Sequence, residues 1–189
     1  MSLPAYMYIY DENGQQIKGS CMALGREGAI EVMNSGYSMY QVTCSSTGKL
    51  TGARQHNGFT LHKDIDKTSP FFAVALCQSR RLQKAVIHYY DVNDAGIEYE
   101  IYRVTLTSIV IMNLDVVHAY MPGSHTPGMI ENITISYAGI EWFYIEGNIK
   151  YDEGPSVTIF SHSSSHNNSD KREVCLYLNG REVKSYVFN

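Results

Sequence analysis

Residues 51–90 read TGARQHNGFTLHKDIDKTSPFFAVALCQSRRLQKAVIHYY, and this stretch decides the fold. Its first part alternates: Phe59, Leu61 and Ile65 fall on one face of an extended segment, which predicts a half-buried β-strand over residues 59–65. The opposite face carries only polar residues, namely Thr60, His62, Asp64 and Asp66.

A short helix is expected after this strand. Ser69 can accept an otherwise unpaired backbone N–H at a helix start, and the fixed φ of Pro70 suits the first helical turn. We therefore expect a helix from Pro70 to about Gln78, followed by a tyrosine-rich strand over residues 84–91.

The rest of the chain is predicted to be mostly strand. Further strands are expected at residues 5–10, 16–22, 29–34, 38–43, 130–137 and 140–145, with a long one from Ile97. In that long strand the apolar positions change from odd to even numbers after Ile101, which indicates a β-bulge. These features predict a mainly β fold: an antiparallel β-barrel or two packed sheets with one short α-helix on the flank.

The C-terminal part carries a hairpin signal. Two alternating segments, residues 173–178 and 182–188, flank Asn179 and Gly180. We expect a main domain over residues 1–155 and an extension over residues 156–189, made of a polar linker at 161–171 and a hairpin at 173–188. An isolated hairpin is marginally stable in water, so this one should dock on the main domain or on a neighbouring subunit.

Composition excludes several classes of protein. Of 189 residues, 18% are charged and 44% hydrophobic, which is typical of a folded domain with a sizeable core. The formal net charge of −4 and the lack of a basic tract argue against nucleic-acid binding. No run approaches the roughly 20 apolar residues that span a bilayer, so no membrane insertion is expected. The N-terminus lacks the basic and apolar regions of a cleaved signal peptide.

The candidate catalytic and metal-binding residues have simpler interpretations. Asp64 and Asp66, like Glu98 and Glu100, have the spacing of an acid–base pair, but no basic or apolar setting that would shift their pKa values. His162 and His166 lie in a serine-rich tract with poor helix propensity. The four cysteines, Cys21, Cys44, Cys77 and Cys175, are widely spaced, as expected for reduced thiols. We expect no catalytic residue, metal site or cofactor, with Cys44 an exposed cysteine rather than a reactive one.

Several segments occur in an order that resembles a known family. They are IKGS at residues 17–20, GAIEV at 28–32, the stretch at 51–90 and ITISYAGIEW at 133–142. Together they resemble the haemolysin-coregulated protein (Hcp) family, the tube subunits of bacterial type VI secretion systems, over roughly residues 5–152. Members of that family commonly stop soon after the strand equivalent to the one containing Trp142, so the C-terminal part departs from the family pattern.

The resemblance implies a mechanical function. The family's barrels associate into hexameric rings, and the rings stack into a hollow tube that carries effectors. The implied partners are further copies of the chain, a contractile sheath, a spike protein and secreted effectors. The implied location is the cytoplasm of a Gram-negative bacterium, followed by secretion without a cleaved signal peptide. No enzymatic activity and no cofactor are implied.

Candidate assembly residues follow from the resemblance and from the strand faces. A subunit or ring interface is expected at Tyr6, Tyr8, Tyr10, Lys49, Arg54, Gln55, His56, Trp142 and Tyr144, with ordinary core packing as the alternative for the aromatic residues. The polar strand faces are candidates for the lumen of the tube, at Thr60, His62, Asp64, Arg103, Thr105 and Thr107. A closed ring requires a heterologous interface whose rotation closes.

Three other functions are compatible with the sequence. The chain could be a monomeric β-sandwich module that binds carbohydrate or protein, a small hydrolase that uses Ser, His and Asp residues of the C-terminal tract, or a phage-tail-tube-like protein. A native mass measurement separates the monomeric module from a six-fold ring.

Overall fold

The computed structural model describes residues 4–120, 123, 128–153, 158–162, 172–178 and 181–188, with side chains as far as Glu153. Ten strands form one large antiparallel sheet. They are β1 (Ala5–Tyr10), β2 (Gln16–Ile17), β3 (Ile30–Val32), β4 (Asn34–Tyr40), β5 (Gln55–Asp64), β6 (Arg81–Val92), β7 (Glu98–His118), β8 (Met129–Ser136), β9 (Gly139–Tyr144) and β10 (Ile149–Glu153). The helix α1 spans Ser69–Cys77.

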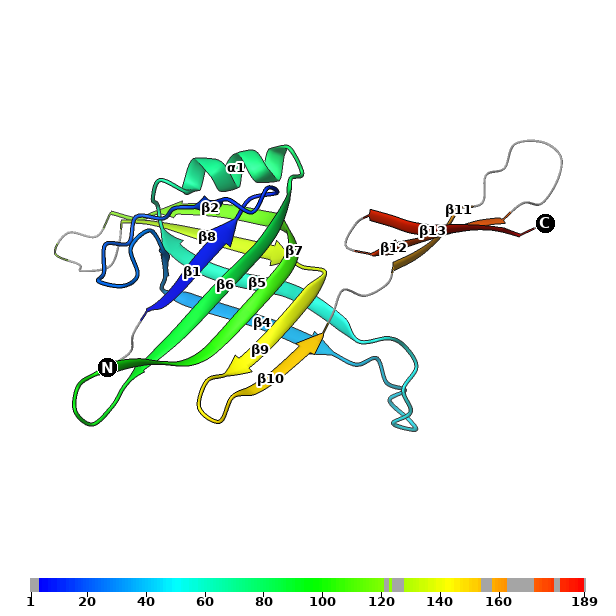
Figure 1. Cartoon of the computed structure of the whole chain (residues 1–189), viewed down its shortest axis with the longest axis horizontal. Coiled ribbons are helices and arrows are strands. Elements are labelled where there is room, and N and C mark those ends of the chain that lie inside the picture. Colours follow the sequence, from blue (N-terminus) through cyan, green and yellow to red (C-terminus); the bar gives the residue numbers. More distant parts are fainter. Residues whose placement is uncertain are drawn as a thin grey trace.

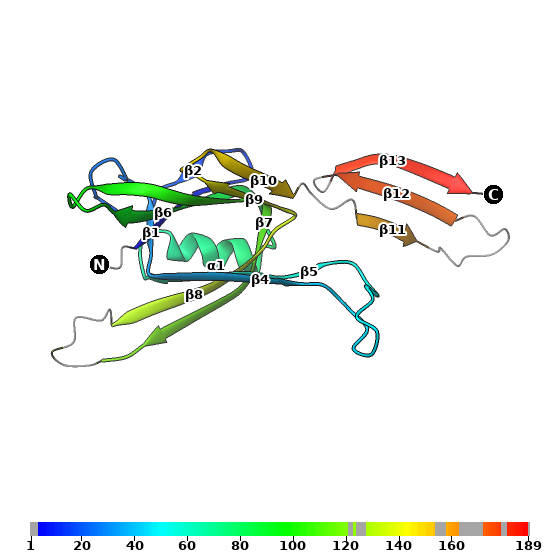
Figure 2. The same ribbon diagram turned by 90° about the horizontal axis from the view of Figure 1, so that it is seen from below.

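The large sheet folds over into two layers. One layer holds β1, β6, β9 and β10, the other holds β4, β5 and β8, and β7 belongs to both (Figures 1 and 2). The first half of β7 pairs with β9, from Tyr102 to Thr107, and its second half pairs with β8 from Val110 onward. Between them Ser108 has a φ of 51°, so the backbone turns where the strand changes layer.

The hydrogen-bonded ladder is not closed into a ring, and one segment bridges the gap. Within residues 30–40, β3 pairs with β1 of the first layer and β4 pairs with β5 of the second. Only Met33 separates the two strands, and its N–H donates to the carbonyl of His62, 2.9 Å away. The expected barrel or pair of packed sheets is therefore a barrel-like two-layer structure with one continuous segment as its link.

The interior between the layers is filled by side chains. Met7, Ile87 and Leu106 of the first layer pack into one cluster with Leu61 and Ile133 of the second. The helix lies at the edge between the layers (Figure 2) and adds Phe72 and Ala75 to the cluster. The space between the layers is thus a packed core rather than a channel.

The predicted β-bulge is confirmed in β7. Tyr89 of β6 pairs with Tyr102, whereas the next residue, Tyr90, pairs with Glu100, so Ile101 is the inserted residue. A second bulge inserts Met112, because Ile111 pairs with Ile135 and Asn113 with Thr134. Each insertion shifts the side-chain alternation by one position and bends the strand.

Two details of residues 51–90 differ from expectation. The buried alternation that begins at Phe59 and Leu61 continues with Lys63 rather than Ile65, because the strand ends at Asp64 and Ile65 lies exposed beyond it. Ser69 does not cap the helix either: α1 begins after Thr68, and the Ser69 hydroxyl accepts the N–H of Asp66 instead. The predicted helix and its Pro70 near the first turn are confirmed.

Some strand bounds were also misplaced. The strand expected at residues 16–22 is only Gln16–Ile17, and the one expected at residues 38–43 is β4, Asn34–Tyr40. Strand β10 was not predicted, although Ile149, Lys150, Tyr151 and Asp152 alternate in type; the strand is short and its residues are mostly exposed.

The C-terminal hairpin is confirmed as part of a second sheet. Strands β11 (Thr158–His162), β12 (Arg172–Leu178) and β13 (Arg181–Phe188) pair with one another in the order β11-β12-β13. Strand β11 includes Ser161 and His162, the first two residues of the expected linker, whereas residues 163–171 and the Asn179-Gly180 turn lie outside the described residues. The division at residue 155 stays a prediction.

Candidate functional site

The described part of the chain offers surfaces rather than a chemical centre. Within it, no three His, Cys, Asp or Glu side chains are placed to hold a metal ion. Its one helix, α1, has nine residues, and no described helix is long and apolar enough to cross a membrane. The predicted assembly residues lie on the outer faces and loops of the described part of the chain.

The outer face of the second layer carries two rows of mostly polar residues, here called the polar wall, and the next row, which contains Asp64, also holds Ile130 and Val117. Because Phe59, Leu61 and Lys63 are buried, Thr60, His62 and Asp64 point away from the core. The strand register places small polar residues beside them. One row consists of Gly36, Thr60, Thr134 and Asn113, and the next of Asn34, His62, Asn132 and Asp115.

The other three lumen candidates lie in the opposite layer. Arg103, Thr105 and Thr107 belong to the first half of β7, which pairs with β6 and β9. Arg103 makes a two-pronged ion pair with Glu100, with N–O distances of 2.7 and 2.8 Å. The two predicted sets therefore face opposite sides of the protomer, and a single lumen can be lined by only one of them.

The tyrosine face of β1 packs largely inside the protomer. Tyr6 is only 6% exposed and lies under the guanidinium of Arg26, whose central carbon is 4.5 Å from the ring. Arg26 also covers Tyr90, at 3.9 Å, and pairs with Glu98 at 2.7 Å. The loop over residues 18–29 is thereby fastened over Tyr6, which corrects the expectation that this side chain meets another subunit.

The two other tyrosines of that face are partly covered. The ring of Tyr8 meets the ring of His88 edge-on, and the two ring centroids are 5.4 Å apart. The ring of Tyr10 lies under the ammonium group of Lys84. Burial raises the pKa of Tyr8, so its hydroxyl stays protonated at neutral pH. Both side chains keep some exposed surface that another molecule can contact.

A loop over residues 41–54 protrudes from one end of the molecule, between β4 and β5 (Figure 1). A bridge between Thr43 and Leu50 holds its two arms together. Lys49 is exposed, and Leu50 is 68% exposed. Hydrogen bonds from Ser46 and Thr47 lower the pKa of Cys44 to about 6, so this thiol is more acidic than an ordinary exposed cysteine.

The root of this loop is tied to the end of β10, by contacts that we call the latch. Arg54 forms an ion pair with Glu153. Nε2 of His56 lies 3.3 Å from the other carboxylate oxygen, and Nδ1 of His56 is 2.8 Å from the hydroxyl of Tyr137. Burial and the nearby Arg54 lower the pKa of His56, so its imidazole is mostly neutral at pH 7. The predicted ring-contact residues Arg54 and His56 are thus also held within their own chain.

The latch has no clear signal in the sequence. Glu153 is distant in sequence from its partners, and β10 was not predicted. The latch residues line a cavity of about 260 Å³. Gln55 lies beside them and accepts a hydrogen bond from the hydroxyl of Tyr40.

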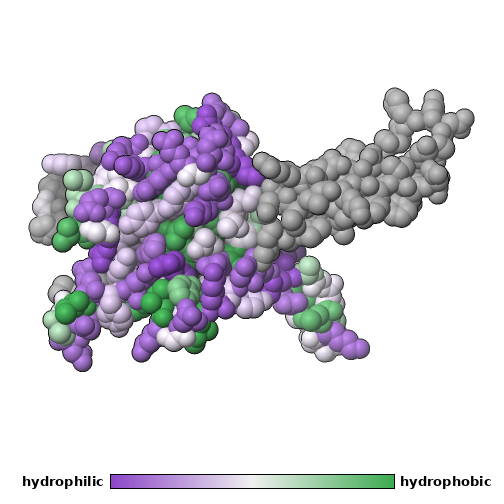
Figure 3. Space-filling model, viewed as in Figure 1, coloured by the Kyte–Doolittle hydropathy of each residue, from purple (hydrophilic) through white to green (hydrophobic). Residues whose placement is uncertain are grey.

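The aromatic residues of β9 lie beside β10, the edge strand of the first layer. Trp142 stacks on Tyr151 of β10, with ring centroids 5.7 Å apart, and its Nε1 is buried without a hydrogen-bond partner among the described residues. Tyr144 is exposed beside Ile149. Figure 3 shows hydrophobic surface over this hairpin. Unlike Tyr144, Trp142 is partly buried against the core.

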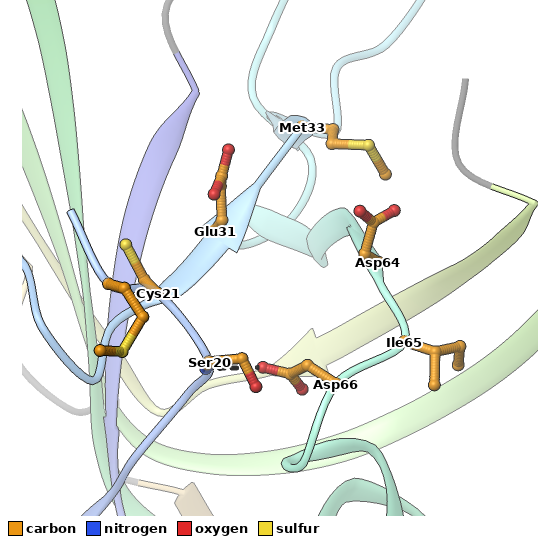
Figure 4. A pocket seen from close by; sticks show the side chains of 8 residues that line it. Ser20, Cys21, Glu31, Met33, Asp64, Ile65 and Asp66 are labelled. Atoms are coloured by element: carbon orange, nitrogen blue, oxygen red, sulfur yellow. Dashed lines mark hydrogen bonds between the residues drawn. The ribbon is translucent and has the colours of Figure 1, made fainter. Parts of the chain in front are cut away.

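The opposite end of β5 carries a shallow cavity of about 470 Å³ (Figure 4). Its walls combine acidic and apolar residues: Ser20, Cys21, Met22, Glu31, Met33, Asp64, Ile65 and Asp66. The N–H of Ser20 donates to Asp66, 3.2 Å away. Met22 is 83% exposed, and Leu24 in the same loop is 95% exposed. This end of the molecule, which we call the receiving end, thus presents apolar side chains to solvent.

A buried ion cluster under the receiving end was missed by sequence reasoning. Lys63 is fully buried, and its Nζ lies 2.8 Å from Glu131 and 2.9 Å from Asp66. Ser69 bridges the same groups, accepting from Lys63 and donating to Glu131. The signal was present in the alternation, because Lys63 occupies the buried phase set by Phe59 and Leu61.

The chain is similar to a known protein family and to several solved structures. Residues 6–144 match the family model described as "Type VI secretion system effector, Hcp". A mutant of Hcp1 from the E. coli EAEC 042 pathovar is 33% identical, with 80% of this chain and 98% of that chain covered and a TM-score of 0.73. Among curated proteins no match is found.

More distant structures share the fold. Hcp3 from Pseudomonas aeruginosa is 22% identical, with 79% of this chain and 98% of that chain covered and a TM-score of 0.62. A structure described as a type six secretion system protein is 14% identical, with 96% of this chain and 99% of that chain covered and a TM-score of 0.63. The last match reaches into strands β11–β13, which the first two do not cover in full.

Proposed function

The chain belongs to the Hcp family of type VI secretion system proteins, and from this premise we propose that it is a structural subunit of the inner tube, whose copies form hexameric rings that stack and carry effectors out of the cell. The family is one of structural tube proteins, so the chain is a structural protein and not an enzyme.

The packed interior of the protomer supports this proposal. Side chains such as Met7, Phe59 and Leu106 fill the space between the two layers, and all three are fully buried. A conduit for protein cargo therefore requires several copies arranged around a common axis. A closed ring of this kind uses a heterologous interface, in which two different surfaces of the protomer meet.

The polar wall is our candidate for the lining of the lumen. It extends over four strands and consists mostly of short polar side chains, such as Thr60, Thr134 and Asn132. These small, mostly uncharged side chains offer cargo few apolar contacts and few ion pairs, and the neighbouring Val117 is an exposed apolar side chain beside them. Such a wall can hold a folded protein weakly and release it, which is the property that a secretion conduit needs.

The two ends of β5 are our candidates for the contact between rings. The loop over residues 41–54, with its exposed Leu50, lies at one end, and the receiving end, with Met22 and Leu24, lies at the other. The ten residues of β5 separate these ends by about 33 Å. If rings stack along the direction of β5, the loop of one ring meets the receiving end of the next, and apolar surface is buried on both sides.

The family also supplies the partners of the proposal. They are further copies of the chain, the contractile sheath around the tube, the spike protein at its tip and the effectors inside it. Assembly in the cytoplasm would precede expulsion from the cell.

Native mass spectrometry and negative-stain microscopy of the purified chain test the proposal. We expect a species with six times the mass of the chain and ring-shaped particles that stack as the concentration rises. A protein that stays monomeric at high micromolar concentration, with no rings in the images, would contradict the proposal and favour a monomeric binding module.

A further inference from the structure

The second sheet lies outside the part of the chain that matches the family. The match ends at residue 144, whereas β11 begins at Thr158. Its three strands pair only with one another among the described residues. Any contact between the extension and the rest of the assembly therefore does not come from strand pairing with the large sheet.

In this second sheet, consecutive residue pairs between β11 and β12 are both made of apolar residue types. Ile159 pairs with Leu176, and the next pair is Phe160 with Cys175. Because neighbouring positions belong to opposite faces, both faces of the sheet carry apolar residues. A three-stranded sheet with apolar residues on both faces leaves apolar surface in water unless another surface covers it. We therefore expect another surface to cover one of its faces.

The latch fixes where the extension leaves the main sheet. Glu153, the last residue of β10, is held by its ion pair with Arg54 at the root of the loop over residues 41–54. Only residues 154–157 connect Glu153 to β11, and such a connection spans at most roughly 17 Å. The extension thus starts at the same end of β5 as the protruding loop.

We propose that β11–β13 of one copy pack against the receiving end of a copy in the next ring, as a second ring-to-ring contact beside the loop. This inference rests on the proposed function. The connection spans at most roughly 17 Å, whereas the receiving end of its own copy lies about 33 Å away along β5, so β11 begins nearer to the loop end than to that surface. Stacking along β5 brings the receiving end of another copy next to the extension.

Residue types on the two surfaces are complementary. The receiving end exposes Met22 and Leu24, which can cover an apolar sheet face. Its cavity also carries three acidic residues: Glu31, Asp64 and Asp66. Strands β12 and β13 contain more basic than acidic residues, with Arg172, Arg181 and Lys184 against Glu173 and Glu182. The residue types therefore suit this contact, and the place where the extension begins assigns the receiving end to another copy.

Truncation after Pro155 tests the proposal. Full-length and truncated chains are compared by native mass spectrometry for ring formation, and by sedimentation and negative-stain imaging for stacking. We expect both to form rings, but the truncated rings to stack only at concentrations more than about tenfold higher, because each ring repeats the contact several times. The proposal is overturned if truncated rings stack at the same or a lower concentration. Failure of the full-length chain to form any ring would count against the proposed function instead.

Chemical cross-linking of the full-length chain gives a second test that does not depend on truncation. Lys184 lies in β13, and Lys18 begins the loop at the receiving end. A short lysine-reactive linker should join Lys18 and Lys184 of different copies in stacked rings and leave them unjoined in single rings. Mixing isotope-labelled with unlabelled protein separates links between copies from links within one. Stacked rings that give no such link would also overturn the proposal.

Discussion

Lys63 is the residue on which the α1 end of the fold depends. It is fully buried, yet it contacts Glu131, Asp66 and Ser69 within 3.0 Å. These contacts join β5, β8 and the start of α1 through one ammonium group. A buried charge is tolerated only when it is paired and hydrogen-bonded in this way.

We expect Lys63→Met to destabilise the protein by about 3–5 kcal/mol, because it leaves the carboxylate of Glu131 buried without its counter-charge. Urea unfolding followed by circular dichroism measures the change. Lys67→Met is the matched control, since Lys67 is exposed in the same connection, and it should change the stability by less than about 0.5 kcal/mol. Equal effects of the two substitutions would contradict the role of the cluster.

Asp66 should make part of the stability depend on pH. Burial by itself would raise the pKa of Asp66, but hydrogen bonds from Thr68 and Lys63 outweigh it, and the pKa lies below the ordinary value of 3.8. A carboxylate with a lowered pKa stabilises the folded state above its unfolded pKa, and this stabilisation is lost as pH falls through the folded value.

The stability difference between the natural chain and Asp66→Asn should therefore be constant from about pH 7 to pH 5 and shrink below about pH 4. Urea unfolding over this pH range measures it. Asp94→Asn, at an exposed turn, serves as the control and should show only a small difference. A difference that grows as the solution is acidified would refute the assignment.

At the scale of elements, bulges shape the strands. Ile101 and Met112 are inserted in β7, and a third irregularity lies between β4 and β5, where Tyr37 pairs with Phe59 but Met39 pairs with His56. Gly58 occupies that place with a φ of 88°, a conformation that suits glycine. A Cβ there would approach the carbonyl oxygen of Ile135 to 3.1 Å.

Gly58→Ala should consequently destabilise the protein by about 1–3 kcal/mol, because alanine is strained at this φ and crowds the neighbouring strand. Thermal or urea unfolding measures the loss. Gly36→Ala is the control on the adjacent strand, where a Cβ would meet only the hydroxyl of Thr60 at an ordinary 3.6 Å. We expect little change in stability from it, and comparable losses in both variants would argue against the bulge as the cause.

At the scale of the whole molecule, the two layers present different outer faces. The polar wall covers the second layer, and the first layer carries the ion pair of Arg103 with Glu100 and the loop fastened by Arg26. Thr60 and Thr107 are both exposed. If the polar wall lines the lumen, Thr60 lies on the inside of the tube and Thr107 on the outside.

Cysteine labelling distinguishes these faces. In a background whose own cysteines are replaced, T60C in stacked tubes should react with a small maleimide but more than about tenfold more slowly with a polymer-linked maleimide, which the narrow tube excludes. T107C, the matched control, should react with both reagents at similar rates. The reverse pattern would assign the lumen to the first layer, and the same variants in dissociated protein should show no difference.

The sequence by itself determined the local structure and the family. Alternation over residues 59–65 predicts β5, the Ser-Pro pair predicts α1, and the change of phase after Ile101 predicts the bulge. These features depend on neighbours a few residues apart, and a single sequence contains all of that information. The Asn-Gly pair likewise predicts the C-terminal hairpin, although the third strand of its sheet has no comparable turn signal.

Only the tertiary structure decided which side each polar or aromatic residue faces. Tyr6 is covered by Arg26, Glu153 reaches Arg54, and Lys63 takes a buried position beside Glu131. Each contact joins residues that are distant in the sequence, so no local pattern encodes it. Thr60 and Thr107 look alike in their strands and are separated only because β7 crosses between the layers at Ser108. The positions of the candidate lumen and ring contacts therefore follow from long-range packing, which fixes the geometry of assembly.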